Sequence, residues 1–98
     1  MDSKMVRKDS VLIVDIECTC WKNKQDPAGQ RSEIIEIGLC RYNLEQDTIT
    51  DKTAILVQPT ESQLSPFCIE LTGITPELLK RKGMSFDVAC SKLKDDYQ

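Results

Sequence analysis

Two carboxylates follow an apolar segment near the start of the chain. Residues 11–14 read Val-Leu-Ile-Val, and Asp15 follows directly, with Glu17 two positions later. Side chains two residues apart on a strand point to the same face, so both carboxylates would project together. Such a pair repels unless one group is protonated or a cation lies between them. Oxygen ligands at this spacing suit Mg²⁺ or Mn²⁺, and a pair of such ions can cleave a phosphodiester bond.

The same pattern also has an ordinary structural interpretation. Asp-x-Glu is only three residues long and occurs often by chance. Taken alone, it more often marks solvated charges at the end of a strand. The metal-site interpretation therefore needs support from the rest of the chain.

The length and composition indicate one small domain. The chain has 98 residues, of which 40% are hydrophobic and 30% charged, as in ordinary globular proteins. We take residues 1–98 as one domain and expect the polar residues 1–10 to form a flexible tail. The net charge of −3 argues mildly against a dedicated nucleic-acid binder, although a carboxylate-rich active site lowers the charge by itself.

The cysteine content predicts free thiols. Five cysteines are an odd number, and the polar N-terminal residues show no signal-peptide pattern. We therefore expect a reducing compartment and a cytoplasmic location, with a nuclear one possible in a eukaryote. No apolar stretch approaches the roughly 18 residues of a membrane helix, and the chain contains no histidine.

Apolar runs predict three strands in the first sixty residues. They cover 11–17, 33–43 and 48–59, with a polar loop at 22–32 and a hairpin connection at 44–47. The first run is continuous rather than alternating, which is typical of a strand covered on both faces.

Three helices are predicted after the strands. Ser65, Thr75 and Ser85 have the residue types of N-caps, and proline follows the first two at the first helical position. Gly73 and Gly83 are predicted to end the first two helices. Phe86, Ala89, Cys90, Leu93 and Tyr97 make an apolar stripe on the third. The element order predicts a three-stranded meander followed by three short helices.

Three blocks of the sequence resemble one enzyme family, in the same order. They are VLIVDIECTCW (11–21), EIIEIGLCRYN (33–43) and LSPFCIELTGIT (64–75). They resemble the DEDD superfamily of 3′–5′ exonucleases, in its DEDDh branch, and most of all the exoribonucleases that trim the 3′ ends of histone mRNA and siRNA. The resemblance implies an α/β, ribonuclease H-like exonuclease fold, truncated here. It also implies two-metal-ion hydrolysis at the 3′ end of a single-stranded nucleic acid, with RNA preferred to DNA.

The resemblance also implies roles for particular residues. Asp15 and Glu17 match the first two metal-binding carboxylates, which would hold two Mg²⁺ or Mn²⁺ ions in a complete domain. Cys18 and Thr19 match positions that approach the 3′-terminal nucleotide.

Further positions match the segment that lines the terminal-base pocket. Leu71, Thr72 and Ile74 belong to that segment, and Phe67 would pack beneath it. Leu71, Ile74 and Phe67 lie at helical spacing, so a core role is an open alternative. Glu36 interrupts an apolar strand, and we interpret it as a structural residue with an internal partner.

The later motifs of the family are missing from this sequence. The resemblance implies four metal-binding carboxylates and a histidine base, whereas this sequence supplies two matching carboxylates and no histidine. We therefore expect the N-terminal portion of a domain, inactive or nearly inactive alone. Strand 11–17 would then be an exposed apolar edge that favours self-association. The alternative function is a non-catalytic remnant of the fold that binds nucleic acid or protein.

Overall fold

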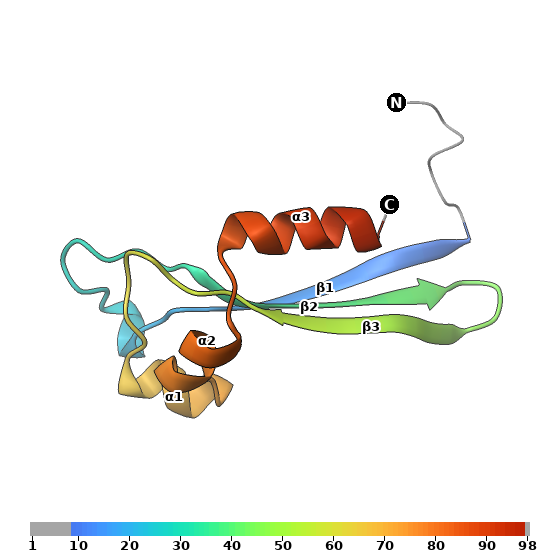
Figure 1. Ribbon diagram of the computed structural model, residues 1–98. Coiled ribbons are helices and arrows are strands. Elements are labelled where there is room, and N and C mark those ends of the chain that lie inside the picture. Colours follow the sequence, from blue (N-terminus) through green and yellow to red (C-terminus); the bar gives the residue numbers. More distant parts are fainter. Residues whose placement is uncertain (1–8, 98) are drawn as a thin grey trace.

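A computed structural model describes residues 9–97 as a three-stranded antiparallel sheet with helices on both faces (Figure 1). The strands are β1 (Ser10–Cys18), β2 (Ile34–Asn43) and β3 (Thr48–Leu56), in the spatial order β1-β2-β3. The helices are α1 (Pro66–Thr72), α2 (Pro76–Lys82) and α3 (Phe86–Asp96), and a short 3₁₀ turn, η2, spans Lys22–Lys24. The predicted meander followed by three helices is confirmed.

Local sequence signals explain where each helix begins. The side chains of Ser65, Thr75 and Ser85 accept hydrogen bonds from backbone N–H groups three residues later, as N-caps do. Gly73 ends α1 in the left-handed region at φ 74°, where a residue with a Cβ would be strained. The three predicted helix starts are therefore confirmed.

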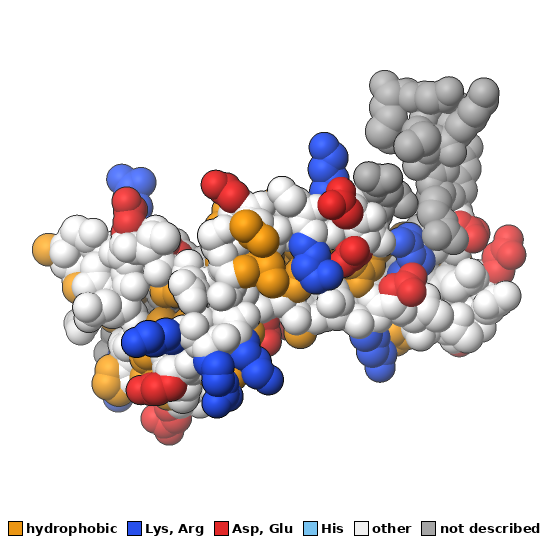
Figure 2. Space-filling view, in the orientation of Figure 1, with side chains coloured by type: hydrophobic (Ala, Val, Ile, Leu, Met, Phe, Trp, Pro, Cys, Tyr) orange, Lys and Arg blue, Asp and Glu red, His pale blue; other side chains and the backbone are white. Residues whose placement is uncertain are grey.

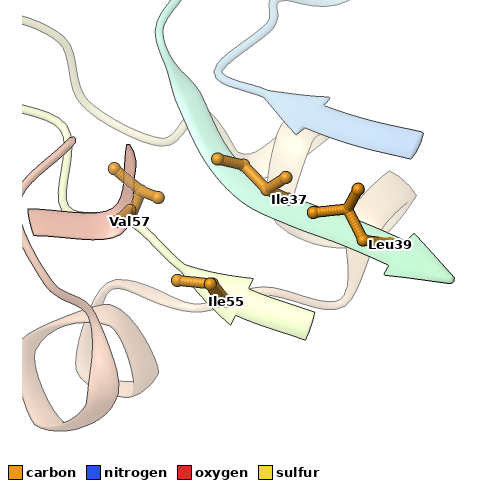
Figure 3. Packing of buried hydrophobic residues seen from close by; sticks show 5 residues of the cluster. Ile37, Leu39, Ile55 and Val57 are labelled. Carbon is orange, nitrogen blue, oxygen red and sulfur yellow. The ribbon is translucent and has the colours of Figure 1, made fainter. Parts of the chain in front are cut away.

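Two apolar clusters hold the helices on the sheet. Ile37, Leu39, Ile55 and Val57 form one cluster with Ala89 of α3 (Figure 3). The other consists of Ile35 of β2 together with Cys68, Ile74 and Leu79 from the segment that contains α1 and α2. In Figure 1, α3 lies over one face, while α1 and α2 lie on the other face near one end of the sheet.

Several predicted boundaries are wrong by one to three residues. β1 begins at Ser10, which is buried, so the predicted flexible tail extends too far; residues 1–8 lie outside the described residues. β3 ends at Leu56 rather than at position 59. The reason is a long-range contact: Val57 makes a parallel bridge to Met84, which local sequence cannot reveal.

The predicted apolar stripe of α3 is only partly correct. Ala89 is buried, and Leu93 and Tyr97 pack against the same cluster. Phe86 and Cys90 are exposed instead. Within residues 9–97, no helix is long and apolar enough to cross a membrane.

Candidate active site

Asp15 and Glu17 project from the same face of β1, close to its C-terminal end. The register pairs Asp15 with Gly38 and Glu17 with Glu36 of β2. Asp15 is exposed and Glu17 is half-buried. Within residues 9–97, neither carboxylate has a hydrogen bond or an ion pair. Both are therefore accessible to a ligand from solution.

Glu36 adds a third carboxylate to this face. It lies directly opposite Glu17, and cross-strand neighbours in an antiparallel pair have Cβ atoms about 4.5–5.5 Å apart. The internal partner expected for Glu36 is absent among the described residues. The expectation of a partner is therefore wrong, because the half-buried side chain shares the accessible carboxylate face instead of entering the core.

These carboxylates fit a divalent cation in chemistry but do not enclose one. Hard cations prefer oxygen ligands, and three unpaired carboxylates on one face supply them. No three cysteine or carboxylate side chains among residues 9–97 lie close enough together to hold a metal ion. The face thus offers part of a coordination shell, and the other ligands would have to come from water, substrate or further protein.

Cys18 follows the carboxylate pair at a β-bulge. The register of β1 on β2 shifts between Glu17 and Cys18, which turns the strand at this point. Burial raises the pKa of the Cys18 thiol, and the Glu17 carboxylate raises it further. Burial and the neighbouring Cys68 thiol likewise raise the pKa of Cys20. Both thiols are therefore neutral at physiological pH, and neither is an activated nucleophile.

Thr19 is fully buried and makes only internal hydrogen bonds. Its N–H donates to Glu33 O (2.8 Å), and its carbonyl accepts from Ser32 Oγ (2.6 Å). Its hydroxyl oxygen accepts from Glu33 N (2.8 Å) and is hydrogen-bonded to Ser62 Oγ (3.1 Å). Substrate contact by Thr19 stays a prediction, and the observed position gives this residue a structural role.

Glu33 is the residue at this site that sequence reasoning missed. Its carboxylate accepts hydrogen bonds from Thr60 N (2.9 Å), Glu61 N (2.9 Å) and Ser62 Oγ (2.6 Å). Burial acts to raise the pKa of Glu33, but these hydrogen bonds outweigh it and hold the pKa below its ordinary value. Together with Thr19, Glu33 ties the β3–α1 connection to the strand end that carries Glu17.

α1 is attached to the same strand end. Ser65 Oγ donates to Cys20 O (2.7 Å), and the Cys68 thiol donates to Cys18 O (3.6 Å). These two contacts place the helix that carries Leu71 and Thr72 beside the residues that follow Glu17. The structure thus joins α1 to the residues that directly follow Glu17, and a shared substrate site there stays a prediction.

The residues of α1 differ in what they expose. Leu71 is 66% exposed, and Phe67, one turn earlier, is also exposed. The Thr72 hydroxyl donates to Cys68 O (2.8 Å) and accepts from Ile74 N (3.1 Å), so it closes the end of the helix. Ile74 is in the core. Of the predicted pocket residues, Leu71 offers an open apolar surface, and Thr72 already uses its hydroxyl internally.

Known proteins with related sequences are nucleases. The sequence profile of the Exonuclease family (RNase T) matches residues 12–95. The chain is 40% identical over 65 residues to the 3′-5′ exonuclease Snipper of Drosophila melanogaster, covering 65% of the chain and 23% of the relative. It is 40% identical over 74 residues to 3′-5′ exoribonuclease 1 of Rattus norvegicus, covering 74% of the chain and 21% of that relative.

Solved structures resemble the fold over most of its length. The nuclease domain of 3′hExo, described as a DEDDh family member bound to rAMP, aligns with a TM-score of 0.78 and 35% identity over 89% of this chain. Cell-death related nuclease 4 aligns with a TM-score of 0.73 and 26% identity over 90% of the chain. The chain spans 42% and 29% of those two chains, and less than a quarter of the two curated relatives. The described strands and helices are therefore part of a ribonuclease H-like exonuclease fold, and the chain belongs to the Exonuclease family.

Proposed function

We propose that the chain is the N-terminal portion of a 3′–5′ exonuclease domain that hydrolyses the 3′ end of single-stranded RNA. One observation carries the proposal: Asp15 and Glu17 lie on one accessible face of β1 with no partner among residues 9–97, in a chain that belongs to the Exonuclease family. Relatives named as 3′-5′ exoribonucleases support RNA as the substrate class.

Asp15 and Glu17 would hold Mg²⁺ or Mn²⁺ in the complete domain. The bound ions supply an activated water and stabilise charge on the phosphate. Glu36, opposite Glu17, adds negative charge to the same face and strengthens its attraction for cations. Two or three carboxylates alone bind such ions weakly, because tight sites use more protein ligands and the substrate phosphates.

The surface beside the carboxylates has features that suit a nucleic-acid end. Leu71 of α1 presents an apolar side chain against which a terminal base could pack, and Cys18 and Thr19 shape the strand end next to it. The last turn of α2 carries Lys80, Arg81 and Lys82, and Figure 2 shows basic side chains gathered over this part of the molecule. These cations would contact phosphates, which offsets the net charge of −3 locally.

The 98-residue chain alone should bind an RNA end weakly and cleave it little or not at all. It contains no histidine to act as general base, and loss of such a base typically slows a reaction by about 10²–10⁴-fold. The site it contributes would then act only in a more complete domain. We place such a domain in the cytoplasm or, in a eukaryotic cell, the nucleus.

Fluorescence anisotropy with end-modified RNA tests this proposal. A short labelled RNA with a free 3′-hydroxyl should bind in Mn²⁺, and binding should weaken with a 3′-phosphate, with DNA of the same sequence, and in Asp15→Asn. Asp95→Asn removes the same charge from exposed α3 and serves as the control. The proposal would be contradicted if the affinity were the same for the 3′-hydroxyl RNA, the 3′-phosphate RNA and the DNA, and were unchanged in Asp15→Asn. Rapid release of nucleotides would instead show that the chain alone is active.

Self-association is a second proposed property of the chain. β1 carries five large apolar side chains that are 43–56% exposed, distributed over both faces of the strand, which is unusual for an edge strand. A non-catalytic module that binds protein through this edge is the corresponding alternative to the enzyme. RNA binding without turnover would agree with the incomplete enzyme and with the non-catalytic module alike. The oligomeric state of the chain therefore has to be measured separately.

A further inference from the structure

Three of the five cysteines lie together where the end of β1 meets α1. Cys18 and Cys20 follow Glu17 closely in the sequence, and Cys68 is the third residue of α1. Cys68 is fully buried, and Cys20 packs against the apolar cluster that contains it. Cys18 and Cys68 are 50 residues apart in the sequence, so the fold itself brings these thiols together.

The backbone on both sides of this thiol group is held in place by hydrogen bonds. Ser65 Oγ donates to Cys20 O (2.7 Å) and accepts from Cys68 N (3.0 Å), so one hydroxyl bridges the two cysteines. The Cys68 thiol in turn donates to Cys18 O (3.6 Å). The cysteines of α1 and of the strand end are therefore fixed next to each other.

Cys20, rather than Cys18, is the partner that offers Cys68 a thiol. Cys18 meets Cys68 through its backbone carbonyl, and the Cys18 side chain interacts with the Ser32 hydroxyl. The Cys20 side chain packs into the cluster of Cys68, and the two thiols interact directly. Cys20 and Cys68 are thus the pair whose sulfur atoms are placed to react with each other.

From this arrangement we infer that Cys20 and Cys68 are a redox pair that a peroxide converts into a disulfide. The peroxide first oxidises Cys20, which is half-buried whereas Cys68 is fully buried; the O–O bond breaks, an S–O bond forms and one water leaves. The Cys68 sulfur then attacks the Cys20 sulfur. The S–S bond forms, the S–O bond breaks, and hydroxide leaves with the Cys68 proton as a second water. The two thiols lose two electrons, which the peroxide gains.

The pair suits slow, reversible oxidation rather than rapid sensing. Burial, followed by the interaction with Cys68, raises the pKa of Cys20, so little thiolate is present at neutral pH and the first step is slow. The second step joins two groups that the fold already holds together, which favours it strongly. The sulfenic acid is therefore trapped as a disulfide before it is oxidised further, and a reducing thiol can restore the pair.

The disulfide would also change the carboxylate site, and this part of the inference rests on the proposed function. It removes the S–H group that donates to Cys18 O, next to Glu17. It also ties α1, which carries Leu71, covalently to the strand end. Small displacements at a binding site have large effects. We expect the oxidised chain to bind the RNA 3′ end about tenfold more weakly, because coupling between two sites is typically about 5–150-fold.

Disulfide mapping by mass spectrometry tests the redox pair. The folded chain is treated with hydrogen peroxide, remaining thiols are blocked with N-ethylmaleimide, and the chain is digested with trypsin without reduction. Cys18 and Cys20 share the tryptic peptide 9–22, so fragmentation between them assigns the bond. We expect one intramolecular disulfide, between Cys20 and Cys68. Cys90→Ser removes an exposed thiol on α3 and is the matched control, which should leave this bond unchanged.

Variants and denaturation show whether the folded geometry selects this bond. Cys20→Ser should lose the disulfide and leave Cys68 reduced, and this variant suffices if Cys68→Ala does not fold. In urea the preference for Cys20 and Cys68 should disappear. A bond between Cys18 and Cys68, or a sulfinic acid at Cys20 beside a reduced Cys68, would overturn the inference. The same preference in urea would also overturn it, because the fold would not be its cause.

Fluorescence anisotropy with the 3′-hydroxyl RNA in Mn²⁺ tests the effect on the site after the peroxide is removed. The affinity should fall about tenfold on oxidation, recover with dithiothreitol, and be unaffected by peroxide in Cys20→Ser. Equal affinities of the oxidised and reduced chains would overturn the regulation alone. Failure of the reduced chain to bind RNA would overturn the proposed function and its regulation, whereas the disulfide map would still decide the redox pair.

Discussion

β1 and β2 have similar apolar sequences but opposite surroundings. Ile35, Ile37 and Leu39 of β2 are at most 9% exposed, whereas Val11 to Val14 and Ile16 of β1 are 43–56% exposed. β2 lies between two strands, and its apolar residues contact both helical layers. Within the described part of the chain, residues 9–97, β1 has a neighbouring strand on one side only. Burial here is set by position in the sheet rather than by the hydrophobicity of the segment.

The two strands also differ in how their polar groups are satisfied. The start of β2 belongs to a network in which Glu33, Thr19 and Ser62 hydrogen-bond one another or nearby backbone groups. The carboxylates of β1 have no partner among residues 9–97. Among residues 9–97, the polar groups at the start of β2 are thus satisfied internally, whereas β1 leaves charged and apolar side chains accessible.

Truncating matched isoleucines should give the largest difference between the strands. Ile35→Ala removes a fully buried side chain and should lower the free energy of unfolding by about 2–5 kcal/mol. Ile16→Ala, on the half-exposed strand, should lower it by less than about 1 kcal/mol under conditions where the chain is monomeric. Urea denaturation of both variants measures this. Equal losses would mean that β1 is as well covered as β2.

Neutralising Glu33 should have the next largest effect. Glu33→Gln replaces one acceptor oxygen by a donor and disrupts the bonds to Thr60, Glu61 or Ser62. We expect the free energy of unfolding to fall by about 1–2 kcal/mol. This is less than for fully buried charged hydrogen bonds, because part of the network is exposed. Glu61→Gln is the control, since the Glu61 carboxylate is exposed and lies outside the network. If Glu61→Gln lowered the free energy of unfolding as much as Glu33→Gln does, the network around Glu33 would not be what stabilises this region.

The same network predicts a direction for the pH dependence of stability. The pKa of Glu33 is below its ordinary value in the folded chain, so the unfolded chain binds the proton more readily. The contribution of Glu33 is complete above its unfolded pKa of about 4.3 and is lost as the pH falls through the lower folded pKa. In thermal melts, the Tm should decline as the pH falls from neutral to acidic, and this decline should be shallower in Glu33→Gln than in the parent chain. Parallel curves would contradict the assignment.

Glu17 should show the smallest effect and the opposite sign. Glu17 lies opposite Glu36 and near Asp15, so Glu17→Gln relieves like-charge repulsion in EDTA. We expect the free energy of unfolding to rise by about 0.2–1 kcal/mol, and this increase should be smaller at high salt concentration. Glu70→Gln on α1 removes the same charge from an exposed helical position and is the control. A loss of stability in Glu17→Gln, with Glu70→Gln neutral, would point to a hidden partner of Glu17.

Features coded by neighbouring residues could be predicted from the sequence. The hairpin at 44–47 and the three N-caps depend on residues within one turn of each other, and the structure places them as predicted. The shared face of Asp15 and Glu17 follows from strand geometry alone. The family resemblance predicted the exonuclease fold, which the solved structures confirm.

Features that join distant residues could not be predicted in this way. Thr19 and Ser62 are 43 residues apart, and Glu33 and Ser62 are 29 apart, so no local pattern relates them. The end of β3 depends on Met84 for the same reason. A carboxylate within an apolar strand predicts an internal partner for Glu36, but the register leaves Glu36 on the accessible face.

Paramagnetic broadening of amide signals by Mn²⁺ tests most directly whether Asp15 and Glu17 bind divalent cations. The ¹⁵N-labelled chain is titrated with small amounts of Mn²⁺, and the same titration is made with Asp15→Asn and Asp95→Asn. We predict selective broadening at residues 15–18 and at residues 36–38 across the strand pair, lost in Asp15→Asn and retained in Asp95→Asn. Uniform broadening over the chain, or a selective pattern unchanged in Asp15→Asn, would contradict the account.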